Sequence, residues 1–219
     1  MLRLNRLFLL GLSVAACSFA QNPPALENDQ VRVLNALDKP HDKHALHEHK
    51  LNRVMVYTQA GEQEIVTKDG KKTTLKFKAG DVKWSEAIGM HTSEIVSNAP
   101  VSLIELEVKK PGDPSKKAAS PLDPTKVSPK NYKVEFENDQ VRVIRVHFAA
   151  HETVPRHDHI LNRAVVYLTD QHAKLTMPDG KTEDSQHKAG QVSWGGAVIH
   201  IEENLMDKPV EAIVVEFKN

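Results

Sequence analysis

The sequence is poor in cysteine and has no excess of charge of either sign. Its 219 residues include one cysteine, Cys17, which lies in an apolar N-terminal segment. The rest of the chain therefore offers no disulfide, no thiolate ligand and no cysteine nucleophile, so any metal must be bound by histidine or carboxylate. The 29 basic residues are balanced by 29 acidic ones. We expect no nucleic-acid partner, because nucleic-acid binding needs an excess of basic residues.

Apolar runs are short, and the one at the N-terminus is too short for a permanent membrane anchor. Two arginines precede this run, and the first acidic residue is Glu27. The pattern predicts a secretory signal over residues 1–20. Cleavage after Ala20 would give a periplasmic or secreted protein. Alternatively, residues 14–17 resemble a bacterial lipobox, and only a lipid on the cysteine at its end would attach the chain to a membrane.

The chain contains an internal repeat. The heptapeptide Glu-Asn-Asp-Gln-Val-Arg-Val at 27–33 recurs at 137–143. Between the copies, residues 109–130 are rich in proline and small polar residues, which favours a semi-extended linker over a packed helix or a central strand. The sequence therefore predicts two domains, 24–108 and 131–219.

Both copies have the pattern of an all-β domain. Short segments rich in β-branched and apolar residues predict strands. These segments are 31–34, 53–57 and 101–108 in the first copy, and 141–146, 164–168 and 210–217 in the second. Asp-Gly-Lys at 69–71 and 179–181 supplies the turn residues of a hairpin. No segment shows a long helical period, so each copy is expected to form a sandwich or a small barrel.

The twelve histidines include two matching sets of three. Each set has a His-x-His pair and a more distant single histidine: His47, His49 and His91, then His157, His159 and His200. Residues i and i+2 of a strand point to the same face, so both imidazoles of a pair can converge on one point. Three neutral imidazoles predict a divalent-metal cofactor such as Fe, Mn, Zn or Ni. Catalytic metal sites also keep an open coordination position.

These motifs resemble those of the cupin superfamily. The segments 47–53 and 157–163 resemble its first motif, and 80–91 and 190–200 resemble its second. The resemblance covers nearly all of both repeats. It implies an all-β bicupin, with two tandem cupin-type jelly-roll barrels joined by a Pro-rich linker. It also implies a small-molecule ligand, and pairing through sheet edges makes a homodimer possible.

One position departs from the cupin pattern. Cupins usually place a glutamate ligand shortly after the second histidine, where this chain has Arg53 and Arg163. Arginine stays protonated and cannot ligate a metal. Three interpretations remain open: a three-histidine site whose arginine binds an anionic substrate, a site completed by Glu94 or Glu203, or a metal-free barrel whose arginine binds an anion directly.

Plain structural roles are the alternative for several of these residues. Arg53 and Arg163 could pair with Glu107 and Glu216, or with other carboxylates of the barrels, as structural ion pairs. The other histidines and the repeated tryptophans and tyrosines are expected to be core or surface residues. The small residues at 195–196 favour the second barrel as the working site, because they could leave room for a ligand.

The first functional hypothesis is an exported metal-dependent oxygenase of a small anionic or aromatic molecule. The histidines would hold the metal, and Arg53 and Arg163 would act as catalytic residues that orient the substrate. The second hypothesis is a non-catalytic module that binds a small anion or a metal ion. A third is a stable scaffold in which the histidines have no remaining role.

Overall fold

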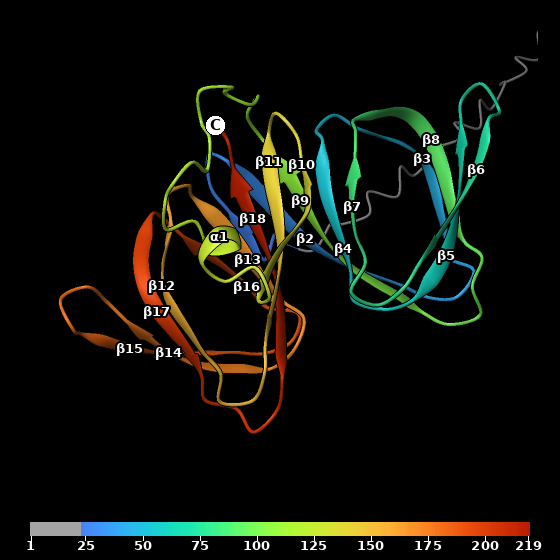
Figure 1. Ribbon diagram of the computed structural model, residues 1–219. Helices are drawn as coiled ribbons and strands as arrows, with labels where there is room; N and C mark the ends of the chain where they lie inside the picture. The colour runs from blue at the N-terminus through green and yellow to red at the C-terminus, as the bar shows by residue number, and fades with distance from the viewer. Residues whose placement is uncertain (1–22) are drawn as a thin grey trace, which may run out of the picture.

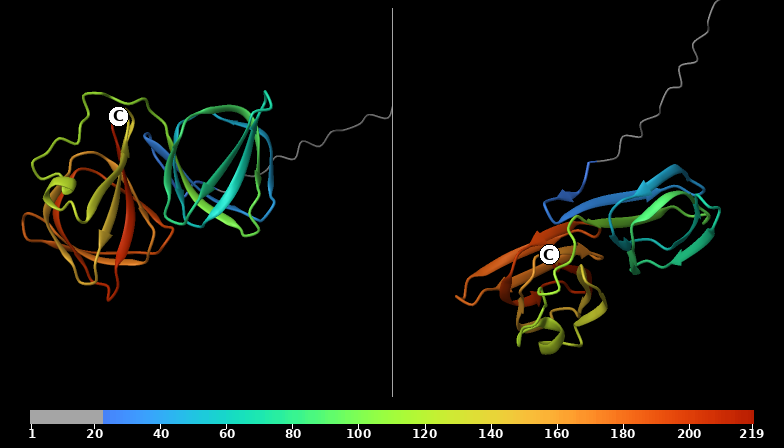
Figure 2. Two further views of the ribbon diagram at one scale, coloured as in Figure 1. Left: turned by 45° about the vertical axis from the view of Figure 1, so that its right-hand side comes forward. Right: turned by 90° about the horizontal axis from the view of Figure 1, so that it is seen from above.

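The computed structural model describes residues 23–219, and the predicted signal over residues 1–20 lies outside the described residues. Two β-barrels lie side by side, the first in blue to green and the second in yellow to red (Figures 1 and 2). We call them barrel 1 and barrel 2. Each consists of one five-stranded and one four-stranded antiparallel sheet. This arrangement confirms the prediction of an all-β fold with two jelly-roll barrels.

The two barrels have the same strand order. In barrel 1 the strands are β1 (Leu26–Glu27), β2 (Val31–Asp38), β3 (Lys43–His49), β4 (Arg53–Tyr57), β5 (Gly61–Thr67), β6 (Lys72–Phe77), β7 (Val82–Ser85), β8 (Ile88–Ile95) and β9 (Val101–Val108). In barrel 2 they are β10 (Tyr132–Glu137), β11 (Val141–Phe148), β12 (Thr153–His159), β13 (Arg163–Tyr167), β14 (Gln171–Thr176), β15 (Thr182–His187), β16 (Val192–Gly195), β17 (Val198–Asn204) and β18 (Val210–Phe217). The sheets follow the orders β1-β2-β9-β4-β7 and β3-β8-β5-β6, and then β10-β11-β18-β13-β16 and β12-β17-β14-β15.

The predicted hairpins are confirmed. β5 pairs with β6, and β14 pairs with β15. Gly70 and Gly180 occupy the two turns with φ of 83° and 84°. Glycine adopts this left-handed conformation without the steric penalty of a Cβ atom, so the Asp-Gly sequence fixes the turn.

The segment 109–130 is not wholly an extended linker. It contains a four-residue helix, α1 (Pro124–Val127), which packs against β10 and β12. Asp123 caps this helix by accepting a hydrogen bond from the Thr125 backbone N–H at 2.9 Å. The prediction that the segment forms no packed helix is therefore wrong at this point. Among residues 23–219, no helix has the length and apolar character needed to cross a membrane.

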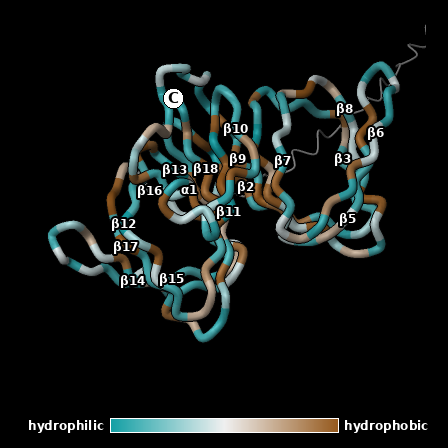
Figure 3. The backbone as a smooth tube through the Cα atoms, in the orientation of Figure 1, coloured by the Kyte–Doolittle hydropathy of each residue, from teal (hydrophilic) through white to brown (hydrophobic). Residues whose placement is uncertain are grey.

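The two barrels share one hydrophobic core. Outward-facing side chains of both five-stranded sheets form a single buried cluster, which includes Val31 and Val33 of β2 and Val141 and Val143 of β11. Figure 3 shows hydrophobic residues concentrated on the strands where the barrels meet. The barrels are thus packed as one body, because neither five-stranded sheet could leave these side chains in water without losing the stabilisation of their burial.

Polar contacts across this interface are paired by symmetry. Asn52 Nδ2 donates to Gln140 Oε1 at 2.5 Å, and Asn162 Nδ2 donates to Gln30 Oε1 at 2.6 Å. Asn52 corresponds to Asn162 in the repeat, and Gln30 corresponds to Gln140. The two contacts therefore have the reciprocal pattern of an isologous interface between two subunits, here within one chain.

Candidate metal centres

Each barrel brings three histidines together on two paired strands of its four-stranded sheet. Histidine cluster 1 is His47, His49 and His91, and histidine cluster 2 is His157, His159 and His200. In each cluster, the first and third histidines lie directly opposite each other on adjacent strands. Ring centroids lie 4.3 to 5.4 Å apart in cluster 1 and 4.6 to 5.8 Å apart in cluster 2. The alternation of side chains along a strand produces the convergence that the sequence predicts.

Hydrogen bonds to the backbone fix the tautomer of three of these histidines. Nδ1 faces a carbonyl oxygen two residues earlier at 2.7 Å in His47, 2.8 Å in His91 and 2.9 Å in His157. A carbonyl oxygen can only accept, so Nδ1 carries the proton and Nε2 keeps its lone pair. This arrangement is typical of metal-binding histidines, whose second ring nitrogen is held by a hydrogen-bond acceptor.

Burial favours the neutral form of His49, His91 and all three histidines of cluster 2. Burial, aided by the positive charge of Arg53, lowers the pKa of His49 to about 3. Burial and the neighbouring histidines lower the pKa of His200 to about 2. Metal ions bind only the neutral imidazole. The donor set, the tautomers and the protonation state therefore all fit a divalent ion, and the prediction of a divalent-metal cofactor is confirmed without specifying the metal.

The two clusters differ in access. All three histidines of cluster 2 are buried, whereas His47 and His49 of cluster 1 are half-exposed. Cluster 1 lies in a cavity of about 1270 Å³ whose wall includes all three of its histidines, Arg53 and Ser93. Barrel 1 therefore offers room for a small molecule beside its metal site.

Tyr132 closes part of the corresponding space in barrel 2. Its hydroxyl lies 3.1 Å from His157 Nε2 and 3.4 Å from Glu202 Oε2. Its ring packs edge-on against Phe148, with ring centroids 5.7 Å apart. The sequence analysis missed Tyr132 because the residue aligned with it in the first copy is Asn22, so the repeat gives no signal at this position.

The equivalent arginines have different partners. In barrel 1, Arg53 is buried and donates to Glu105 at 2.9 Å and to Ser85 at 3.0 Å. Val214 takes the place of Glu105 in barrel 2, and Arg163 donates to the backbone oxygen of Gly196. Within residues 23–219, no carboxylate oxygen lies within 4.0 Å of the Arg163 guanidinium. Burial lowers the pKa of Arg163.

The predicted ion pairs of Arg53 with Glu107 and of Arg163 with Glu216 are not formed. The alternative, a structural pair with another carboxylate of the barrel, is confirmed for Arg53 by its contact with Glu105 at 2.9 Å. Arg32 instead pairs with Glu107 at 2.6 Å. In barrel 2, Arg142 is equivalent to Arg32, and its guanidinium lies 3.4 Å from the Glu216 carboxylate. Arg53 lies directly across from Glu107 in the strand register, but the two side chains do not pair. The same holds for Arg163 and Glu216.

Glu94 and Glu203 do not complete either cluster. Glu94 pairs with Lys43 at 3.2 Å, and Glu203 pairs with Lys174. Both lie an odd number of positions from the third histidine of their barrel, so strand alternation turns them outward. The prediction of a fourth ligand at these positions is wrong. Glu202, two positions from the third histidine, faces the interior of barrel 2, and burial raises its pKa to about 7.

At Gly195, the room expected for a ligand in barrel 2 is taken by an arginine side chain. A Cβ atom on Gly195 would lie 3.2 Å from the Cζ atom of Arg163. The missing side chain thus makes space for the arginine itself.

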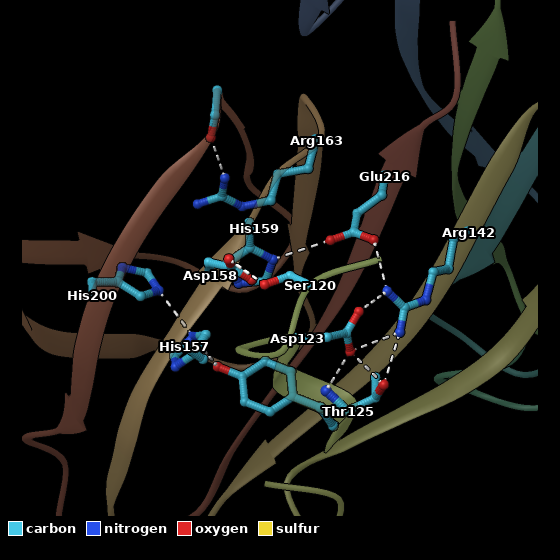
Figure 4. A network of polar contacts seen from close by, with 12 residues as sticks. Ser120, Asp123, Thr125, Arg142, His157, Asp158, His159, Arg163, His200 and Glu216 are labelled. Atoms are coloured by element: carbon cyan, nitrogen blue, oxygen red, sulfur yellow. Dashed lines mark hydrogen bonds and ion pairs between the residues drawn. The ribbon is translucent and has the colours of Figure 1, made fainter. Parts of the chain in front are cut away.

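A network of charged and polar side chains supports cluster 2 (Figure 4). His159 Nδ1 lies 3.2 Å from Glu216 Oε1, and the other oxygen of Glu216 accepts from Arg142 at 3.4 Å. Arg142 also donates to both carboxylate oxygens of Asp123, at 2.5 and 3.0 Å. These contacts link the histidine cluster to helix α1.

Further residues have the structural roles that their patterns indicate. His44 pairs with Asp38 at 3.3 Å, and His172 pairs with Asp184 at 2.6 Å. The His187 ring stacks on a neighbouring tyrosine, and His147 is exposed.

Comparison with known proteins identifies the fold. No protein-family model and no curated protein matches the sequence. AerE from Microcystis aeruginosa has a similar structure, with a TM-score of 0.63 and 12% identity over 87% of this chain and 88% of that chain. A tryptophan-to-tyrosine variant of oxalate decarboxylase from Bacillus subtilis has a TM-score of 0.61 and 15% identity over 87% of this chain and 69% of that one. A further structure of that enzyme, studied for its Mn(II) centres, has a TM-score of 0.60. The chain thus has the tandem cupin-type fold that its histidine motifs resemble.

Proposed function

We propose that the chain is an exported, metal-dependent cupin-type enzyme that turns over a small molecule in barrel 1. The observation that carries this proposal is the half-exposed histidine cluster in the wall of a cavity of about 1270 Å³. Pockets for small molecules are typically roughly 300–1,000 Å³ and combine apolar walls with a few polar groups. The barrel 1 cavity is large enough to hold such a molecule against the cluster.

The chemistry of the cluster favours an oxygenase. A divalent ion held by three neutral nitrogens would supply Lewis-acid or redox chemistry at the cavity wall. His47 and His91 keep their Nε2 atoms aimed inward through the backbone contacts of Nδ1. Arg53, which Glu105 and Ser85 hold in place, lines the same cavity and would position the substrate there.

Nitric oxide binding to the Fe(II)-loaded protein tests for an open coordination position in barrel 1. We expect the electron paramagnetic resonance signal of a high-spin iron–nitrosyl complex, retained in His157→Ala/His159→Ala and lost in His47→Ala/His49→Ala. Oxygen consumption should follow the same pattern when small aromatic and carboxylic compounds are added. A signal that survives loss of His47 and His49 would contradict the proposal.

One observation favours a second function, the capture of a small anion in barrel 2. Arg163 has no carboxylate partner within 4.0 Å among residues 23–219, so its charge is available to an anion. We expect Arg163→Gln to weaken formate binding at least tenfold and Arg53→Gln to leave it unchanged, as measured by calorimetry. Equal effects of both substitutions would contradict this assignment.

Export is proposed from the sequence of the first twenty residues. Mass spectrometry of the protein from its native host tests it. An N-terminal Gln21 supports secretion, and a lipidated Cys17 supports a membrane-anchored form. An intact N-terminal methionine would contradict both.

A further inference from the structure

We infer that the cavity of barrel 1 binds a neutral, hydroxylated aromatic molecule, a phenol, with its hydroxyl directed at His47. This inference rests on the proposed function and names its substrate class. It comes from comparing the two barrels of the same chain, since barrel 2 holds a phenol of its own beside its histidine cluster.

Tyr132 supplies that phenol. Its ring is buried between Phe148 and cluster 2, with its centroid 5.1 Å from that of His157. Its hydroxyl lies 3.1 Å from His157 Nε2 and 3.4 Å from Glu202. A jelly-roll interior of this kind can therefore hold a phenol with its hydroxyl at the metal-facing nitrogen of the first histidine.

The described part of barrel 1 places no such ring beside its histidine cluster. β10 pairs with β11 starting from Tyr132, whereas β1 contributes only Leu26 and Glu27 to the pairing with β2. Among residues 23–219, no tyrosine, phenylalanine or tryptophan ring packs against cluster 1 as Tyr132 packs against cluster 2.

The residues around the place of Tyr132 are also smaller in barrel 1. Ala36 lies where barrel 2 has Val146, the residue directly across from Tyr132 in the strand register. Ser93 lies where barrel 2 has Glu202. Ala36, Ser93 and His47 all line the cavity of about 1270 Å³. The space taken by the tyrosine in one barrel is thus part of the open cavity in the other.

The charges that line this cavity favour a neutral ligand. Arg53 pairs with Glu105 at 2.9 Å, and Arg32 pairs with Glu107 at 2.6 Å. Asp38, which replaces Phe148, pairs with His44 at 3.3 Å. Each of the two guanidinium groups thus has a carboxylate partner within the wall, and Asp38 is held by a histidine. Apolar side chains complete the lining and would contact an aromatic ring: Leu34, Met55, Ile65, Leu75 and Leu103.

Calorimetric titration of the zinc-loaded mature chain with phenol tests the inference. We expect one phenol per chain, bound at least tenfold more tightly than benzoate, which matches its ring but adds a charge. Cyclohexanol, which keeps the hydroxyl and loses the aromatic ring, should also bind at least tenfold more weakly.

Two variants locate the site. Ala36→Phe places a ring in the proposed position and should reduce phenol affinity at least tenfold with no change in zinc content. Tyr132→Ala should open the corresponding space in barrel 2 and raise the stoichiometry to two phenols per chain. Tyr132→Ala tests the inference by adding a phenol site, so the inference can still be tested if Ala36→Phe fails to fold.

The outcomes separate the inference from the function on which it rests. Saturable zinc binding with no phenol binding, or phenol binding that Ala36→Phe leaves unchanged, overturns the inference alone. Tighter binding of benzoate than of phenol also overturns it. Failure of cluster 1 to bind any divalent metal overturns the proposed function. In that case, titration of the metal-free chain with phenol still shows whether the cavity of barrel 1 binds a phenol.

Discussion

At the scale of single residues, Arg53 and Arg163 occupy equivalent positions but differ in their partners. The difference comes from one residue on the neighbouring strand, which is Glu105 in barrel 1 and Val214 in barrel 2. The repeat predicts that both arginines exist. It does not predict this difference, because the partner is distant in the sequence and its identity changes between the copies.

The Arg53–Glu105 pair should contribute to stability. Glu105→Gln leaves a buried guanidinium without its carboxylate, and we expect the free energy of unfolding to fall by about 3 kcal/mol. Urea denaturation measures this change. The matched control is Glu94→Gln, which removes the exposed pair with Lys43 and should change stability by less than about 1 kcal/mol. Equal effects of the two substitutions would contradict the structural account of Arg53.

His49 should make the metal-free protein less stable in acid. Its pKa is lowered from 6.5 to about 3 by burial and by Arg53, so below pH 6.5 the unfolded chain binds a proton that the folded chain does not. Its contribution to stability is therefore present above pH 6.5 and is lost as the pH falls toward 3.

Comparison with His49→Gln isolates this contribution. The comparison is needed because Glu202 and Glu216, whose pKa values burial raises to about 7, act in the opposite sense. We expect the variant to gain stability relative to the unsubstituted chain between pH 7.5 and pH 5, measured by urea denaturation. A difference that does not depend on pH would show that His49 is not buried in the neutral form.

At the scale of elements, helix α1 is a place where the amino-acid composition predicts the wrong structure. Five prolines and many small polar residues in 109–130 favour an extended linker. The helix exists because Asp123 caps it and also accepts two hydrogen bonds from Arg142 of β11. The contact with Arg142 is long-range and leaves no local pattern in the sequence. The capping residue followed by Pro124 is a local signal of a helix start, but the composition of the whole segment outweighs it. The hairpins, by contrast, follow from local turn residues and are predicted correctly.

Asp123 should therefore hold this segment in place. Asp123→Ala removes the cap and leaves the buried Arg142 with Glu216 at 3.4 Å as its one carboxylate, beside the Thr125 hydroxyl at 2.8 Å. We therefore expect a loss of about 3 kcal/mol in unfolding free energy. Limited proteolysis should also cut the segment near Lys116 and Lys117 faster. Thr125→Val is the control, since it removes a hydroxyl that accepts from Arg142 at 2.8 Å and donates to Asp123 at 2.5 Å but leaves the backbone cap in place, and it should cost about 1 to 2 kcal/mol. Unchanged proteolysis of Asp123→Ala would contradict this role.

At the scale of the whole molecule, the duplication explains both the sites and the interface. The repeated histidines form two clusters, and the repeated Gln30 and Asn52 positions form the reciprocal contacts between the barrels. The sequence predicts two domains, whose small size indicates that they pack on each other. It does not predict which residues form their common core. Outward-facing valines look the same in a sequence whether they meet a second sheet or line a barrel interior.

The shared core predicts that both barrels unfold together. Trp84 of barrel 1 and Trp194 of barrel 2 both pack against it. Single-tryptophan variants, Trp84→Phe and Trp194→Phe, should therefore report the same urea midpoint by fluorescence as the whole chain does by circular dichroism, after correction for each variant's stability. Two separated midpoints within one variant would show that the barrels unfold independently.

The metal content of the chain shows whether both histidine clusters are metal centres. The mature chain, purified without a histidine tag and loaded with zinc, iron, manganese or nickel, should bind about two equivalents by mass spectrometry, one for each cluster. His47→Ala/His49→Ala and His157→Ala/His159→Ala should each retain one equivalent. Absence of stoichiometric metal in the unsubstituted chain, or loss of both equivalents in either variant, would contradict two independent three-histidine metal centres.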